Sequence, residues 1–172
     1  MSIFPDPRLC AAILAARSAQ FASRRLGTGG GSTIPGVVAR RVDPGVLNKL
    51  SKRLPLGSAA ITGTNGKTTT TGMISKILAT AGVRAVNNST GANLVTGVTA
   101  ALVSDSSLTG KPTSEMGLFE VDEASVPRVA AESELKILAV LNQKGGNDVS
   151  ADTRDLQIEV APVGSKILKS HR

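Results

Sequence analysis

Hydrophobic and polar positions along this chain repeat with two different periods, and the period changes several times. Short apolar runs bounded by glycine or polar residues are typical of buried strands, and they occur at residues 59–62, 83–87, 117–121 and 136–141. Apolar positions three or four residues apart predict helices at residues 7–25, 44–53, 67–81, 94–103 and 124–131. From residue 56 onward strands and helices alternate, so the pattern predicts an α/β fold with a mainly parallel sheet.

The first 55 residues do not follow this alternation. The helix predicted at 7–25 is followed by the glycine-rich stretch 27–36, which predicts a flexible joint. Asp43 is a suitable N-cap for a short helix that would have Pro44 at its first position. We therefore expect a helical N-terminal extension at 1–55 and an α/β unit from residue 56.

Composition and charge narrow the possible functions. Of the 172 residues 41% are hydrophobic but only 2% are aromatic, so the core must consist of aliphatic residues, and binding of single strands by base stacking is not expected. The net charge of +7 is uneven: residues 1–53 hold nine Lys/Arg and two Asp, whereas residues 54–172 hold eleven residues of each sign. The basic extension is either a solvated surface or a face for anionic phospholipid or a phosphorylated substrate.

The most informative stretch is residues 58–71, Ser-Ala-Ala-Ile-Thr-Gly-Thr-Asn-Gly-Lys-Thr-Thr-Thr-Thr. A strand, a glycine turn and a helix in this order form a phosphate-binding loop, in which main-chain N–H groups and the helix dipole attract an anion. Glycine is needed at Gly63 and Gly66 because a Cβ would hinder the close backbone approach. Lys67 would lie near the terminal phosphates, and the Thr68 hydroxyl could bind Mg²⁺. The alternative is a threonine-rich turn with an incidental lysine, but the flanking strand and helix favour a nucleoside triphosphate.

A second candidate group follows the strand predicted at 117–121, which ends in Glu120, Val121, Asp122 and Glu123. Ligands of parallel sheets bind at the carboxyl ends of the strands, where carboxylates suit Mg²⁺ or the ordering of a water molecule. The alternative is a solvated acidic turn, with Asp122 and Glu123 at the N-terminus of the next helix. The phosphate loop favours Glu120 as a metal-linked residue and leaves Asp122 as a cap.

Three segments together resemble the Mur ligase superfamily: residues 63–69 (GTNGKTT), 90–93 (TGAN) and 120–123 (EVDE) followed by Pro127-Arg128. The general phosphate-loop pattern would require glycine where Ile61 stands. The shorter spacing in the first segment occurs in fewer families than the general pattern. Within the superfamily the chain is most similar to the MurT family of lipid II isoglutaminyl synthase subunits. The resemblance runs from about residue 5 to Asn142.

This resemblance implies a reaction and its participants. MurT-type subunits work with a GatD-like glutaminase: ATP phosphorylates the α-carboxyl of D-glutamate in lipid II to an acyl phosphate, and ammonia from glutamine displaces the phosphate. The resemblance assigns catalytic roles to Lys67 and Glu120, places Asn93 near the substrate, and gives Mg²⁺ to Thr68 and Glu120. It gives ATP binding to the whole loop, namely Gly63, Thr64, Asn65, Gly66, Lys67, Thr68 and Thr69. No nucleic-acid partner is expected.

The chain also departs from the family. The family's stretch after Asn142 is replaced by Gln143-Lys144-Gly145-Gly146, and its four-cysteine zinc ribbon and C-terminal domain are missing, since Cys10 is the only cysteine. Residues 143–172 resemble nothing in the family. We therefore expect an incomplete Mur ligase ATP-binding domain at 56–142, a divergent and poorly ordered tail at 143–172, and no activity of this chain alone.

Location and rival functions follow from the same features. The apolar run at 9–16 is too short to span a bilayer and lacks the basic segment of a signal peptide, so ATP chemistry predicts a cytoplasmic protein. Lipid II as substrate would bring it to the inner face of the membrane.

Two alternative functions remain for this sequence: a fragment of another Mur or folylpolyglutamate-type ligase, and a non-catalytic basic binding module.

Overall fold

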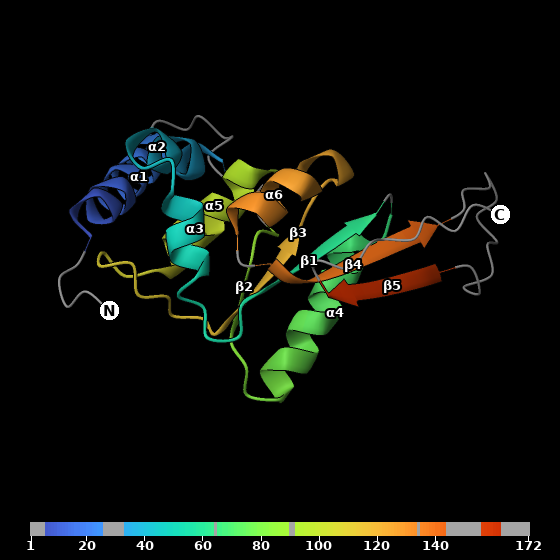
Figure 1. Ribbon diagram of the computed structural model, residues 1–172. Coiled ribbons are helices and arrows are strands. Elements are labelled where there is room, and N and C mark those ends of the chain that lie inside the picture. Colours follow the sequence, from blue (N-terminus) through green and yellow to red (C-terminus); the bar gives the residue numbers. More distant parts are fainter. Residues whose placement is uncertain are drawn as a thin grey trace.

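Five strands form the sheet of this computed structural model, which describes residues 6–25, 33–63, 65–89, 92–133, 135–143 and 156–162. The strands lie side by side in the following order (Figure 1): β2 (Ala85–Asn87), β3 (Met116–Glu120), β1 (Ser58–Gly63), β4 (Leu135–Gln143) and β5 (Leu156–Pro162). The first four strands are parallel, and β5 pairs with β4 in the antiparallel direction. All six residues of β1 are buried, as expected for the central strand of a parallel sheet.

The two faces of the sheet are covered differently (Figure 1). On one face, the described helix is α4 (Lys67–Thr80), whose Ile74 and Leu78 pack on a small cluster formed by Ala59, Ile61, Leu118 and Ala139. On the other face lie α5 (Val95–Asp105), the short helix η1 (Glu123–Ser125) and α6 (Val126–Glu132). Successive side chains of a strand point to opposite faces of the sheet, so Ala60 and Phe119 point to this second face. There they belong to a hydrophobic core that is larger than the cluster beneath α4.

The N-terminal helices α1 (Pro7–Arg25), α2 (Ile34–Val42) and α3 (Val46–Ser51) pack on α5 and extend the larger core. Helices α2 and α5 approach so closely that a Cβ added to Gly36 would lie 1.9 Å from the carbonyl oxygen of Thr96. A side chain at that position would separate the two helices. Helix α5 therefore joins the N-terminal helices to the sheet.

The predicted α/β class and mainly parallel sheet are confirmed, but three local predictions need correction. The joint predicted at 27–36 was wrong at its end, because residues 34–36 begin α2; residues 27–32 lie outside the described ranges. The helix predicted from Pro44 begins instead at Val46, after a turn in which the Asp43 Oδ1 atom accepts a hydrogen bond from the Gly45 N–H at 3.1 Å. Strand β5 lies within the segment 143–172, for which the sequence predicts no element. The division of the chain into three parts stays a prediction.

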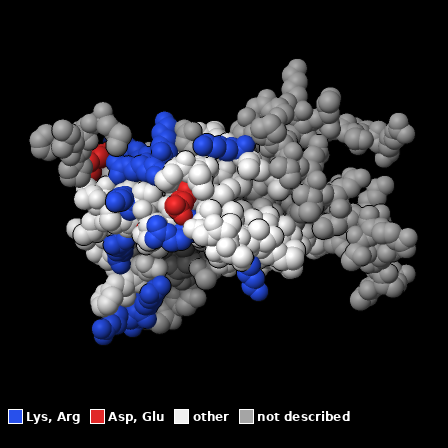
Figure 2. Space-filling model, turned by 90° about the horizontal axis from the view of Figure 1, so that it is seen from below, with Lys and Arg blue, Asp and Glu red and all other residues white. Residues whose placement is uncertain are grey.

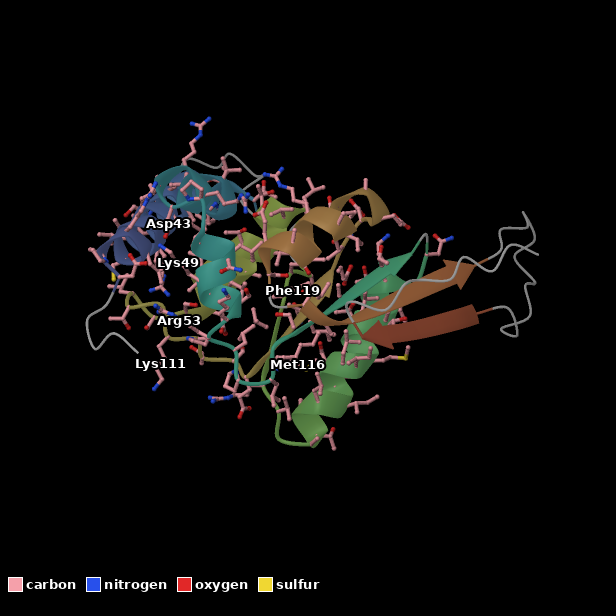
Figure 3. All side chains as sticks on the ribbon, viewed as in Figure 1. Asp43, Lys49, Arg53, Lys111, Met116 and Phe119 are labelled. Carbon is pink, nitrogen blue, oxygen red and sulfur yellow. The ribbon has the colours of Figure 1, made fainter. Side chains whose placement is uncertain are left out.

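The positive charge of the N-terminal extension gathers on the helices α1–α3. Figure 2 shows Lys and Arg side chains over the half of the molecule that carries these helices, with few acidic side chains among them. Lys49 is one of the paired cations: its Nζ atom lies 2.7 Å from a carboxylate oxygen of Asp6 and 2.7 Å from one of the buried Asp43 (Figure 3). The sheet and its own helices are close to neutral by comparison.

Candidate functional site

The candidate site begins at the bend between β1 and α4. Gly63 and Gly66 have positive φ angles of 134° and 81°, and Gly66 immediately precedes the first helical residue. Residues with a Cβ rarely adopt such angles, so the two glycines allow the chain to turn from a buried strand directly into a helix. Thr64, which lies between them, is outside the described residues.

The N-terminus of α4 faces this bend without a capping side chain. The residue before the helix is a glycine, and no side-chain hydrogen bond from the described residues caps the helix. The first N–H groups of any α-helix lack intrahelical acceptors, and the helix dipole adds partial positive charge there. Asn65, Gly66, Thr68 and Thr69 are all exposed, so an anion can approach these donors from solvent.

Lys67 lies over the bend. Its Nζ atom donates a hydrogen bond to the carbonyl oxygen of Gly63 at 2.5 Å and lies 3.8 Å from Oδ1 of Asp122. The Lys67 side chain is 15% exposed. The bend therefore carries a fixed positive charge beside the main-chain donors of α4.

Thr68 and Glu120 meet across the strand ends. Glu120 is the last residue of β3 and pairs with Ile61 of β1, which places it at the carboxyl end of two neighbouring parallel strands. The Thr68 hydroxyl donates a hydrogen bond to Glu120 Oε2 at 2.9 Å. Glu120 is only 3% exposed, and its second oxygen, Oε1, is buried without a hydrogen-bond partner among the described residues. A buried carboxylate oxygen with no partner is unusual and requires an explanation.

A divalent cation fits this pair of side chains. Mg²⁺ prefers oxygen ligands, takes only one or two from the protein, and fills its other positions with water and phosphate oxygens. Glu120 offers an unpaired carboxylate oxygen beside the Thr68 hydroxyl, which is the donor set that such a site needs. The described residues contain no group of three or more His, Cys, Asp or Glu that could enclose a metal by themselves, so phosphate oxygens would have to complete this site.

The structure brings together the main residues that the sequence singles out. Lys67, Thr68 and Glu120 lie around the bend, and Gly63, Asn65, Gly66 and Thr69 lie on the bend or in the first turn of α4. Thr64 is the one residue of the predicted site that lies outside the described ranges. The roles of these residues in binding ATP or Mg²⁺ stay predictions.

Two alternatives for the acidic segment can be decided. Glu120 is buried, so it does not belong to a solvated acidic turn. Asp122 makes no capping hydrogen bond through its side chain to η1, and its carboxylate faces Lys67 instead. Asp122 does occupy the predicted N-cap position, before η1, but there it accepts a hydrogen bond from the Ser125 N–H through its main-chain carbonyl at 2.8 Å and not through its side chain.

One residue of the site was not found from the sequence. Asn88 follows β2 and lies between the strand predicted at 83–87 and the helix predicted at 94–103, yet it is only 2% exposed. Its side-chain amide makes two hydrogen bonds of 2.8 Å with the main chain of Glu120. Asparagine after a strand usually indicates a turn, and nothing in the local pattern shows that its partner lies 32 residues away.

A separate hollow of about 440 Å³ lies at the other end of α4, lined by Ser75, Ala79 and residues 82–85. It opens between the C-terminal half of α4 and the start of β2 and contains none of the site residues. We assign no function to this hollow.

Comparison with known families agrees with the geometry of the bend. The Mur ligase middle domain matches residues 61–140, which run from β1 to β4 and include the bend, Lys67, Thr68 and Glu120. This part of the chain is similar to the middle domain of Mur ligases. The α/β fold and the parallel strands β2, β3, β1 and β4 are consistent with this match.

Curated relatives extend the similarity beyond this domain. The chain is 39% identical over 121 residues to the subunit MurT of the glutamine-hydrolysing lipid II isoglutaminyl synthase of Staphylococcus aureus, a match that covers 70% of this chain and 26% of that protein. It is 38% identical over 131 residues to the same subunit from Streptococcus pneumoniae, covering 76% of this chain and 28% of the relative. The chain thus spans about a quarter of the length of these relatives.

Among the described residues, no helix combines the length and the apolar character needed to cross a bilayer.

Proposed function

We propose that this chain provides the ATP-binding part of a MurT-like ligase, with the bend between β1 and α4 receiving the phosphates. One observation carries the proposal: within the described part of the chain, Glu120 Oε1 is buried without a hydrogen-bond partner beside the Thr68 hydroxyl, and no described side chain caps the start of α4. A phosphate-bound Mg²⁺ explains this oxygen, because the cation would satisfy it and the main-chain donors would bind the phosphates.

Each residue of the site has a distinct task in this proposal. The main chain of residues 63–69 surrounds the phosphates, and Lys67 exchanges the Gly63 carbonyl for a phosphate oxygen. Thr68 and Glu120 hold Mg²⁺. When bound, the cation supplies charge that offsets the negative charge developing on the transferred phosphoryl group.

The names of the relatives support a particular overall reaction. The γ-phosphoryl group of ATP would pass to a carboxylate oxygen of the D-glutamate residue in lipid II, releasing ADP and giving an acyl phosphate. Ammonia from a GatD-like glutaminase partner would then form the carbon–nitrogen bond, lose a proton and release phosphate with that oxygen. A carboxylate needs this activation because its own oxygen is a poor leaving group. The substrate would place the protein at the cytoplasmic face of the membrane.

We assign only the nucleotide-binding share of this reaction to the present chain, because it spans about a quarter of its relatives. The chain alone should not amidate lipid II when supplied with the glutaminase, glutamine and Mg-ATP. Formation of the amide, followed by mass spectrometry, would contradict this.

The binding proposal is tested by the thermal stability of the 172-residue chain with and without Mg-ATP. At a ligand concentration one hundred times the Kd, binding should stabilise the folded state by about 2.7 kcal/mol. Lys67→Ala should abolish this shift. Lys76→Ala removes an exposed lysine from the same helix and should leave the shift unchanged. Wild-type protein that shows no shift, or a shift that survives Lys67→Ala, would refute the proposed site.

The same variants separate this proposal from a basic binding module. Binding to DNA or to anionic vesicles that weakens with salt and is unaffected by Lys67→Ala would indicate that the charge on α1–α3 is the functional feature.

A further inference from the structure

Asn88 lies directly after the point where the pairing of β2 with β3 ends. The last paired residues of the two strands are Asn87 and Leu118. Beyond them β3 continues to Glu120, whose main-chain N–H and C=O need partners on the side that β2 no longer covers. The side chain of Asn88 supplies these partners, and it is only 2% exposed.

Two hydrogen bonds join the Asn88 amide to one residue. Asn88 Nδ2 donates to the Glu120 carbonyl oxygen at 2.8 Å, and the Glu120 N–H donates to Asn88 Oδ1 at 2.8 Å. The side chain thus takes the place of the next peptide group of β2. The orientation of the amide is determined by these contacts, because the reverse orientation would set two donors against each other.

A third hydrogen bond connects the same amide to the loop after β2. Asn88 Nδ2 also lies 3.3 Å from the carbonyl oxygen of Ala92, so both of its hydrogens have acceptors. The end of this loop is held again by the Asp122 N–H, which donates to the Asn93 carbonyl oxygen at 2.8 Å. One buried amide therefore links the loop that carries Asn93 to the strand end that carries Glu120.

We propose that Asn88 is a positioning residue, which holds the main chain of Glu120 so that its carboxylate meets the Thr68 hydroxyl and a phosphate-bound Mg²⁺. This inference rests on the proposed function of the site. On its other side the same strand end is held by β1, since the Val121 N–H donates to the Ile61 carbonyl oxygen at 2.9 Å. Glu120 is thus fixed between a strand and a side chain, and the side chain can be removed without breaking the strand pairing.

The test compares nucleotide affinity with and without the cation. The Kd of a fluorescent ATP analogue is measured for the 172-residue chain in excess Mg²⁺ and in EDTA. The ratio of the Kd in EDTA to the Kd in Mg²⁺ reports how much the metal strengthens binding. Removing a residue that orients a metal ligand usually weakens metal affinity by about 10- to 100-fold. Asn88→Ala should therefore lower the ratio by about tenfold or more. The affinity in EDTA depends on Lys67 and the bend, and it should change little.

A control separates positioning from a general loss of stability. Leu50→Ala empties part of the core in α3, where Leu50 is 1% exposed, and should lower the melting temperature while leaving the ratio at its wild-type value. Glu120→Gln should lower the ratio at least as far as Asn88→Ala does. A wild-type chain with no Mg²⁺-dependent binding would refute the proposed function itself. If instead wild type and Glu120→Gln behave as proposed but Asn88→Ala keeps the full ratio, only the role of Asn88 is wrong.

Two further measurements keep the inference testable if Asn88→Ala does not fold. Asn88→Asp keeps the size of the side chain and its acceptor for the Glu120 N–H, but removes both donors, and it should also lower the ratio. In the wild-type chain, the Glu120 N–H should exchange with solvent deuterium as slowly as the amides of β1. Rapid exchange at Glu120 would show that Asn88 does not hold this peptide, and would overturn the inference.

Discussion

Replacing Glu120 by glutamine removes a negative charge from a residue that is 3% exposed and has one carboxylate oxygen without a partner in the part of the chain that the structure describes. The hydrogen bond from Thr68 can survive, because the glutamine oxygen still accepts it. A neutral polar atom buried without a partner costs about 1–3 kcal/mol, and a charged one costs more. We therefore expect the variant to be more stable than wild type by about 1–2 kcal/mol when Mg²⁺ and nucleotide are absent. For a chain of this size that is a rise of roughly 2–8 °C in melting temperature.

The same substitution at Glu132 provides a matched control, because its expected effect on stability has the opposite sign. Arg40 donates two hydrogen bonds to this carboxylate, at 2.5 and 3.2 Å, and Arg128 donates a third at 2.8 Å. Burial opposes ionisation of Glu132, but the bonds from the two arginines outweigh it and hold the pKa of the carboxyl below its ordinary value of 4.5. Since the Glu132 side chain is 28% exposed, Glu132→Gln should cost only about 1 kcal/mol, or a fall of roughly 2–4 °C.

Calorimetry of both variants in EDTA, and again in Mg-ATP, measures these effects. In EDTA the melting temperature should rise for Glu120→Gln and fall for Glu132→Gln. With Mg-ATP, the Glu132 variant should gain as much stability as wild type, whereas the Glu120 variant should gain little. A fall in melting temperature for Glu120→Gln in EDTA would refute the reasoning, because it would show that the carboxylate is already stabilised without a cation.

Further expectations concern packing and charge away from the bend. Gly36→Ala should destabilise the chain by about 1–3 kcal/mol in urea titrations, because its Cβ would overlap a main-chain carbonyl of α5. A Cβ at Gly72, which lies in helix α4, would meet no atom within 4 Å, so Gly72→Ala should stabilise the chain by about 0.5–1 kcal/mol in the same titrations. Lys49→Met leaves the buried Asp43 without its ion pair and should cost about 1–3 kcal/mol in those titrations, so an unchanged midpoint would contradict the pairing. The stability difference between wild type and Glu132→Gln should be complete above about pH 4.5, shrink as the pH falls below that value, and disappear as the pH falls through the lower, folded-state pKa; a difference as large at pH 3 as at pH 7 would be inconsistent with the lowered pKa.

The elements that carry the bend were predicted because their signals are local. A buried apolar run, two glycines and a helix follow one another within residues 58–81, and each signal is strong without its neighbours. Helix α2 was missed because its buried residues, Pro35, Gly36 and Ala39, are small and indicate a joint rather than a helix. Its close packing on α5 is a tertiary contact that the sequence pattern does not contain.

The residues of the site also divide into those that the sequence could predict and one that it could not. Lys67 and Thr68 belong to one short motif, and the topology of a parallel sheet brings the end of β3 to the same place, so Glu120 could be expected beside them. Asn88 could not be expected, because its function depends on β2 ending one residue earlier. Strand β5 was missed although Leu156-Gln157-Ile158-Glu159-Val160 alternates between apolar and polar residues, because the family resemblance ends before this segment.

The contact between Lys67 and the Gly63 carbonyl affects how quickly and how tightly an anion can bind. A free lysine side chain gives up as much as about 2 kcal/mol of rotamer entropy when it becomes fixed. Here the ammonium group is already immobilised by its own loop, so an arriving phosphate replaces one oxygen by another without ordering a flexible chain. Association should therefore proceed in a single fast phase, and its entropy should reflect mainly the release of water.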